Sequence, residues 1–84
     1  MNILWDEPKR QSNIDKHGFD FADLTEEFFA AARIVPAKEG RFMAIGEFGG
    51  ARVVVVIFAA RGADAISVIS MRRADRKERS LRNG

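Results

Sequence analysis

The sequence predicts an α+β fold in which N-terminal helices pack on an antiparallel β-meander that a short C-terminal helix follows. The segment Val53–Ala60 is continuously apolar and rich in β-branched residues, which is typical of a strand buried on both faces. Gly49-Gly50 precedes it and Arg61–Asp64 follows it, and both sequences favour turns. Extended segments lie beyond each turn. We therefore expect three consecutive antiparallel strands, at residues 41–48, 52–60 and 65–71.

The first turn also predicts a strand register. A two-residue turn at Gly49-Gly50 places Glu47 opposite Arg52, two side chains of opposite charge. The strands carry three phenylalanines, Phe42, Phe48 and Phe58. In this register the first two share one face of the sheet and the third lies on the other. Core packing explains all three better than a surface on which nucleic-acid bases would stack.

At the N-terminus the residues predict an edge strand and a helix. Asn2–Trp5 is a short apolar segment that can add to the edge of the sheet. Asp6 is a good N-cap, Pro8 fits the first turn, and Gly18 suits the left-handed conformation that ends many helices. We expect this helix to end near residue 16 or 17. It is mostly polar, with Ile14 as its main anchor.

A second helix is predicted from Asp20 onward. Phe19 precedes this N-cap, and Leu24 follows at the position where a hydrophobic staple forms. Phe21, Leu24 and Phe28 recur at helical spacing, so we expect them in the core rather than at a ligand site. The chain then breaks before the first strand of the meander.

The C-terminal residues predict a short basic helix. Asp75 and Glu78 have the spacing of a capping box, in which each side chain accepts a hydrogen bond from the other residue's backbone N–H. Leu81 is almost the only apolar residue that follows. A helix this short and polar is marginal alone, so we expect it to dock through one or two contacts or to await a partner.

Composition limits the class of protein. The chain has 84 residues, no cysteine and a net charge of +2, which predicts a single domain at residues 1–84 and fits a reducing cytoplasm. No apolar run approaches the roughly 20 residues that span a bilayer, so no membrane partner is expected. Basic residues gather in residues 72–84, where they can neutralise phosphates, meet an acidic partner or form a solvated helix face.

A series of short motifs runs through nearly the whole chain. They are Trp5-Asp6, Lys9, Asn13, Lys16-His17-Gly18, Phe21, Arg41, Ile45-Gly46, Arg61-Gly62, Ile69-Ser70, Arg72, Ala74 and Glu78-Arg79. Together they resemble the BrnT toxins. The resemblance implies a type II toxin–antitoxin system with a small RelE-like ribonuclease, which cuts RNA to block translation. It also implies a BrnA-type antitoxin as partner, with a toxin–antitoxin heterotetramer as one form of the complex. The chain departs from the family pattern at Ser67, Met71 and Arg82.

This resemblance sets a chemical task. Cutting RNA without a metal needs a base for the 2′-hydroxyl proton, cations around the phosphorane-like transition state and a donor for the leaving 5′-oxygen. Since the chain has one His and no Tyr, arginine must carry much of this work. The candidate catalytic residues are Arg72, Arg79, His17 and Glu78. The candidate RNA-binding residues are Arg61, Arg73, Arg76 and Lys16. We expect neither a metal site nor a cofactor.

Structural roles compete with these functional ones. His17 stands at a helix C-terminus, where an imidazole favours the macrodipole. Glu78 already serves the capping box, and Arg79 on an exposed helix can be a solvated cation. The best single cluster of cations is Arg72, Arg73, Arg76 and Arg79. Arg61 lies about 23 Å from Arg72 along a straight strand, so it contacts a distant part of the RNA or holds its turn.

A second class of function stays open at this point. A non-catalytic module that binds antitoxin or nucleic acid on the same scaffold is favoured by the absence of a His pair and of Tyr. The valine-rich sheet also has few helical apolar residues to cover it, which predicts that a partner completes one face or edge. An RNA-cleavage assay separates the two classes.

Overall fold

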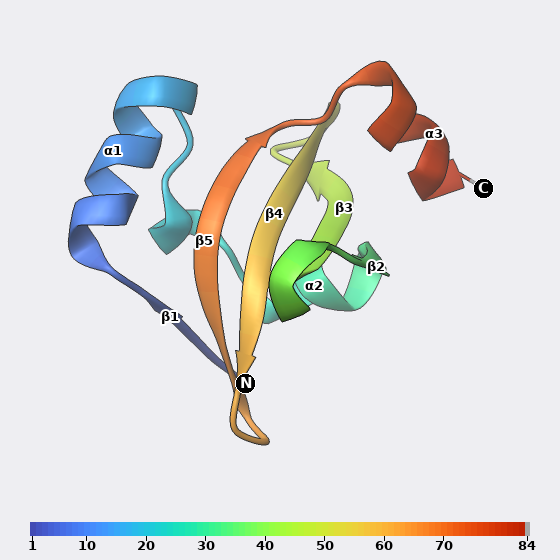
Figure 1. Ribbon diagram of the computed structural model, residues 1–84. Coiled ribbons are helices and arrows are strands. Elements are labelled where there is room, and N and C mark those ends of the chain that lie inside the picture. The colour runs from blue at the N-terminus through green and yellow to red at the C-terminus, as the bar shows by residue number, and fades with distance from the viewer. Residues whose placement is uncertain (84) are drawn as a thin grey trace.

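Residues 1–83, which the computed structural model describes, form an α+β structure built on a five-stranded mixed sheet (Figure 1). The strands are β1 (Asn2–Trp5), β2 (Arg33–Pro36), β3 (Phe42–Phe48), β4 (Arg52–Arg61) and β5 (Ala65–Arg73), and their order is β1-β5-β4-β3-β2. The α-helices are α1 (Glu7–His17), α2 (Glu26–Ala31) and α3 (Arg76–Asn83), and the 3₁₀ helices are η1 (Phe21–Asp23) and η2 (Lys38–Gly40). The predicted α+β class is confirmed.

The sheet is mixed because β1 runs parallel to β5, with Asn2 opposite Ala65 and Trp5 opposite Val68. All other neighbouring strands pair antiparallel. The prediction of an antiparallel sheet is therefore wrong at this edge, although the edge strand itself was expected. The strand β2 was not expected, because four residues are too few for an alternating pattern to stand out. None of the helices within residues 1–83 is long and apolar enough to cross a membrane.

The strand β4 lies at the centre of the sheet, as its apolar sequence predicts. Val54, Val55 and Val56 are all 0% exposed, so three consecutive side chains are buried although they alternate between the two faces. This confirms that β4 is covered on both sides. Its neighbours β3 and β5 continue the two cores that these valines begin.

The β3–β4 hairpin has a register one residue away from the predicted one. Phe48 pairs with Arg52, so the turn contains three residues, the two glycines and Ala51. Gly49 and Gly50 have φ of 64° and 91°, which a residue with a side chain rarely adopts. We expected a two-residue turn because only the Gly-Gly pair was considered. The extra turn residue shifts the pairing of β4 against β3 by one position, so each residue of β3 now lies opposite a residue that was expected on the other face of the sheet.

The corrected register changes two expected contacts. Glu47 pairs with Val53 rather than Arg52, and its carboxylate lies 3.6 Å from the Arg82 guanidinium. Phe42 lies opposite Phe58, and their rings stack with centroids 5.7 Å apart. The prediction that these two rings face opposite ways is therefore wrong. Core packing, the role expected for the phenylalanines, is what the structure shows.

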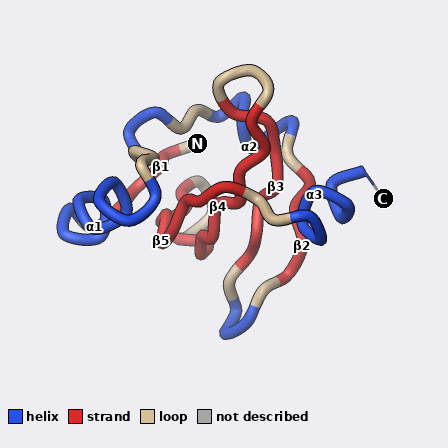
Figure 2. Tube along the Cα trace, turned by 90° about the horizontal axis from the view of Figure 1, so that it is seen from above, coloured by secondary structure: helices blue, strands red, loops and turns tan. Residues whose placement is uncertain are grey.

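The two faces of the sheet differ in their cover. The Phe21 face, named after the fully buried Phe21, packs against η1 and α2 and holds the larger core. The opposite face, which we call the Arg72 face, holds a smaller core of Ile45, Val55 and Ala74. Figure 2 shows α1 and α3 on opposite sides of β4 and β5.

The segment between α1 and β2 buries the predicted side chains, but it forms a 3₁₀ turn and a separate short helix instead of one helix. Asp20 caps only the single 3₁₀ turn of η1, accepting from the Ala22 N–H at 2.9 Å. Leu24 is extended, and Thr25 caps α2 by accepting from the Phe28 N–H at 3.2 Å. The prediction of one continuous helix from Asp20 is therefore wrong, because Thr25 acts as a second N-cap and begins a new helix. The three side chains expected in the core, Phe21, Leu24 and Phe28, are all buried.

The helix α1 begins and ends where the sequence indicates. Asp6 accepts from the Lys9 N–H at 3.3 Å, and Gly18 has φ of 75°. The predicted anchor is wrong, however. Ile14 is only half-buried, whereas Asn13 is 6% exposed and hydrogen-bonds the backbone of Met71. The side chain of Asn13 bonds the edge of β5 just beyond Val68, where the pairing with β1 ends.

The helix α3 docks through the few contacts that its composition predicts. The capping box is confirmed, since the Glu78 N–H donates to Asp75 at 2.8 Å and the Asp75 N–H donates to Glu78 at 3.0 Å. The helix lies against β3, where Arg82 meets Glu47. Leu81 stays 41% exposed.

Candidate active site

Arg72 and Glu78 form a charged pair joined by two hydrogen bonds, as Arg10 and Asp20 also do. Arg72 is near the end of β5 and Glu78 is in the first turn of α3, where the capping box fixes it. The two terminal nitrogens of Arg72 donate to the two carboxylate oxygens of Glu78, each at 2.7 Å. This planar fork orients the guanidinium strongly. The side chains are 34% and 12% exposed, so the cation still reaches solvent.

The pair changes the proton affinity of both groups. The pKa of Glu78 is lowered, first by the hydrogen bonds from Arg72, against an opposing effect of burial. The pKa of Arg72 is raised, first by its hydrogen bonds to Glu78. A carboxylate with a lowered pKa and both oxygens occupied accepts a proton poorly. Glu78 therefore suits the task of holding Arg72 better than that of a general base.

One part of Arg72 remains available to a ligand. A terminal nitrogen also donates to the Arg73 carbonyl at 3.4 Å, beside its bond to Glu78. Within residues 1–83 the Nε–H of Arg72 has no hydrogen-bond partner. Since a guanidinium carries five N–H groups in a rigid fork, a phosphate oxygen can still bind an oriented donor here.

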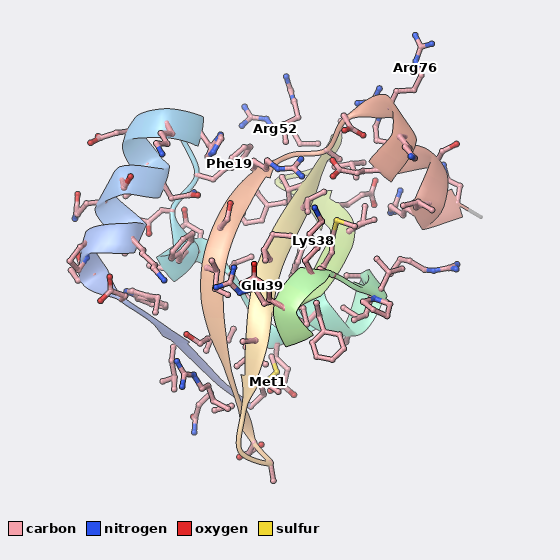
Figure 3. All side chains as sticks on the ribbon, in the orientation of Figure 1. Met1, Phe19, Lys38, Glu39, Arg52 and Arg76 are labelled. Carbon is pink, nitrogen blue, oxygen red and sulfur yellow. The ribbon has the colours of Figure 1, made fainter. Side chains whose placement is uncertain are left out.

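The expected cluster of four arginines is only partly assembled. Arg72 and Arg79 both bond groups at the junction of β5 and α3, where Arg72 donates to Glu78 and Arg79 donates to the Ala74 carbonyl at 3.0 Å. Arg73 follows Arg72 in β5 and pairs with Val54, so strand alternation turns it to the Phe21 face. Arg76 extends away from the molecule at the start of α3 (Figure 3).

Arg61 is far from this junction, as the sequence predicts. It pairs with Ala65 at the first residue of β5, whereas Arg72 pairs with Val55 near the last. The two arginines therefore lie at opposite ends of β5. They cannot bind the same phosphate.

A hollow of about 240 Å³ lies between α1 and β5. From α1 it is lined by Lys9, Ser12, Asn13, Lys16 and His17. From β5 it is lined by Ile69 and Ser70. Ser70 pairs with Ile57 and precedes Arg72 by two residues, so both point to the Arg72 face about 7 Å apart along the strand. The hollow therefore lies beside Arg72, on the same face of β5.

His17 takes part in this hollow more clearly than in helix capping. The cap of α1 is made by the backbone, since the Gly18 N–H donates to the Ile14 carbonyl at 2.9 Å. None of the hydrogen bonds within residues 1–83 uses the imidazole of His17, which is exposed. The structure thus brings Lys16 and His17 to the same side of β5 as Arg72 and Ser70.

Asn13 was noted in the sequence only as part of the family resemblance, and no structural role was expected for it. Asn13 donates to the carbonyls of Phe19 and Met71 and accepts from the Met71 N–H, at 2.8 to 3.0 Å. It lies four residues before His17 and four after Lys9, on one helix face. That spacing is visible in the sequence, but nothing local shows that the face meets a strand edge. No group of three or more His, Cys, Asp or Glu side chains placed to hold a metal ion occurs in residues 1–83.

Comparison with known proteins agrees with these features. Residues 5–78 match the family model described as the ribonuclease toxin BrnT of type II toxin–antitoxin systems. The chain belongs to the BrnT family. It is accordingly a ribonuclease toxin of a type II toxin–antitoxin system, with RNA as substrate and an antitoxin as partner.

A solved structure supports the membership. The chain is similar to the Brucella abortus ribonuclease toxin BrnT, whose crystal structure has a resolution of 1.1 Å. The sequences are 59% identical, the TM-score is 0.85, and the match covers 90% of this chain and 99% of the Brucella chain. A search of curated proteins gave no match.

Proposed function

We propose that this BrnT-family chain cuts RNA on the Arg72 face, beside the junction of β5 and α3, without a metal ion. The observation that carries the proposal is the bidentate pair of Arg72 and Glu78, which holds an oriented cation next to the hollow that contains His17. An oriented donor that needs no rearrangement during reaction is the most effective kind for stabilising a charged transition state.

The proposed reaction uses the RNA as its own nucleophile. The 2′-oxygen attacks the adjacent phosphorus and loses its proton, and the 5′-oxygen leaves and gains one. Arg72 stabilises the extra negative charge on the phosphorane oxygens through its free N–H. His17 is the candidate for moving a proton, because it lines the hollow and its imidazole has no hydrogen-bond partner within residues 1–83. Glu78 acts through Arg72 and not on the substrate.

The remaining cations contact the RNA around this centre. Arg79 and Arg76 on α3 lie on the side of the following nucleotides, and Lys16 lies on the side of α1. Arg73 points to the Phe21 face and Arg61 lies at the other end of β5, so both contact the RNA outside the reacting phosphodiester. Each such contact adds salt-dependent affinity without sequence preference.

We assign a BrnA-type antitoxin as the partner, in a heterotetramer with two toxin chains, in the cytoplasm, and a RelE-like relationship for the fold. Support comes from apolar side chains that the chain leaves exposed. Ile34 on the edge strand β2 is 43% exposed and Leu81 on α3 is 41% exposed, so a partner can cover both.

A non-catalytic binding module is the alternative. The observation that favours it is the engagement of Glu78, because both oxygens of this carboxylate bind Arg72 and leave no free base beside it. In this case the same surface binds RNA or antitoxin without turnover.

Cleavage by purified, antitoxin-free protein in the presence of a chelator decides between the two. We expect cleaved RNA, growth arrest when the chain is expressed alone, and loss of both in the double variant Arg72→Ala, Arg79→Ala. Arg33→Ala is the matched control, since Arg33 is exposed on β2 at the other edge of the sheet. RNA binding without cleavage across varied substrates supports the module, and full toxicity of the double variant removes the β5–α3 junction from the mechanism.

A further inference from the structure

The helix α1 turns a polar face toward β5, which is unusual for a helix that packs on a sheet. Such helices normally bury an apolar stripe. Here the side chains that approach β5 are Lys9, Ser12, Asn13 and Lys16, and the half-buried Ile14 adds little apolar area. Asn13 holds the helix in place by hydrogen bonds instead. A polar face that does not close onto the strand leaves the hollow open.

The cations of this face differ from the other cation of α1. Arg10 forms ion pairs with Glu7 and with Asp20, and its Nε lies 2.8 Å from the Oδ1 of Asp20. Lys9 and Lys16 form no ion pair within residues 1–83. No acidic residue lines the hollow, and Ser70 lines it from β5. The hollow therefore concentrates unneutralised positive charge and hydrogen-bond donors, which is the chemistry that binds a phosphate.

We propose that this hollow is a binding site for a second phosphate of the RNA backbone and the ribose attached to it. The inference rests on the proposed function only in taking RNA as the ligand. Lys9 and Lys16 hold the phosphate oxygens, and the hydroxyls of Ser12 and Ser70 donate to the phosphate or to the ribose. With this group seated, the neighbouring phosphodiester lies along β5 toward Arg72, two residues beyond Ser70.

The size of the hollow sets what enters it. The hollow has a volume of about 240 Å³, and of the residues that line it all but Ile69 are polar. A phosphate has five heavy atoms, so part of the ribose fits with it, while the base stays outside. The site therefore reads the backbone and gives no base preference, and any sequence preference of the toxin arises elsewhere on its surface.

Nucleoside 3′-monophosphates test the site, because they carry a phosphate and a ribose but no bond that the toxin cuts. We would titrate the full chain with adenosine 3′-monophosphate, cytidine 3′-monophosphate and inorganic phosphate, and follow backbone amide signals by NMR. The expected shifts lie in Lys9–His17 and at Ile69 and Ser70. The two nucleotides bind within about threefold of each other, and inorganic phosphate binds more weakly.

A double variant, Lys9→Gln and Lys16→Gln, keeps both exposed side chains long and removes their charge. We expect its dissociation constant for the nucleotides to rise by about tenfold or more, the equivalent of losing one charge-assisted hydrogen bond. Lys38→Gln is the control, because Lys38 is an exposed lysine on η2. Unchanged amide spectra away from α1 show that the fold is retained.

The results separate this inference from the proposed function. Shifts confined to α3, or a double variant that binds within twofold of the wild type, overturn the site even when the chain cuts RNA. Inorganic phosphate that binds as tightly as the nucleotides overturns the entry of the ribose. Nucleotide binding in the hollow by a chain that fails to cut RNA supports the site and refutes the proposed reaction.

Discussion

Replacing Asn13 with alanine tests whether one side chain joins α1 to the sheet. Asn13 bonds both the N–H and the carbonyl of Met71, and also the carbonyl of Phe19. Met71 is 0% exposed, so water does not reach these groups without a change in structure. Alanine removes the partner and leaves three buried backbone groups unpaired.

The expected loss of stability follows from those three groups. A buried donor or acceptor left without a partner destabilises a protein by about 1 to 3 kcal/mol. Three of them give roughly 3 to 6 kcal/mol, allowing for partial relaxation. A chain of this length has a total stability of about 4 to 13 kcal/mol. Asn13→Ala should therefore lower the melting temperature by more than about 12 °C.

Urea unfolding, followed by circular dichroism, measures this loss. Asp15→Ala is the matched control, because Asp15 is an exposed residue of the same helix and forms no ion pair within residues 1–83. The control should stay within about 0.5 kcal/mol of the wild type. An Asn13→Ala variant that loses less than about 1 kcal/mol of stability would show that other contacts hold α1 to the sheet.

Three further predictions concern the site and the core. Glu78→Gln should slow RNA cleavage by about tenfold, because Arg72 loses its charged partner and part of its orientation; a single-turnover rate within twofold of the wild type would contradict a positioning role. The same variant should weaken the acid sensitivity of folding. The pKa of Glu78 is lowered from its ordinary value of 4.5, so its contribution to stability is present above pH 4.5 and is lost as the pH falls below that value. Urea midpoints from pH 7 to pH 3 should therefore fall more for the wild type than for the variant, and parallel curves would count against the ion pair. Gly46→Ala places a methyl group 3.2 Å from side-chain atoms of Ala32 and Phe28, which should destabilise the fold by about 1 to 3 kcal/mol; an unchanged urea midpoint would show that α2 does not pack closely on β3.

Local signals in the sequence were sufficient for several elements. The cap at Asp6, the left-handed Gly18 and the capping box of Asp75 and Glu78 each depend on residues a few positions apart, and all three are found. The continuous apolar run of β4 was likewise sufficient to place the central strand. These features need no knowledge of distant contacts.

Features set by distant contacts were missed. The parallel pairing of β1 with β5 joins residues more than 60 positions apart, and nothing near Asn2 indicates it. The hairpin register failed because Gly49-Gly50 is compatible with a two-residue and a three-residue turn. For the site, the sequence placed Arg72 at the end of β5. It could not place His17 beside that strand, because Asn13 and the β1 pairing together set the position of α1.

In the proposed reaction Arg72, held by Glu78, stabilises the transition state of RNA cleavage. The single-turnover cleavage rate of Arg72→Ala, measured in chelator beside the Arg33→Ala control, tests this role most directly. We predict a rate lower by about a hundredfold or more, as is typical when one oriented donor to a developing anion is removed, with the control unchanged. A folded Arg72→Ala variant that cuts RNA within threefold of the wild-type rate would show that Arg72 does not stabilise the transition state.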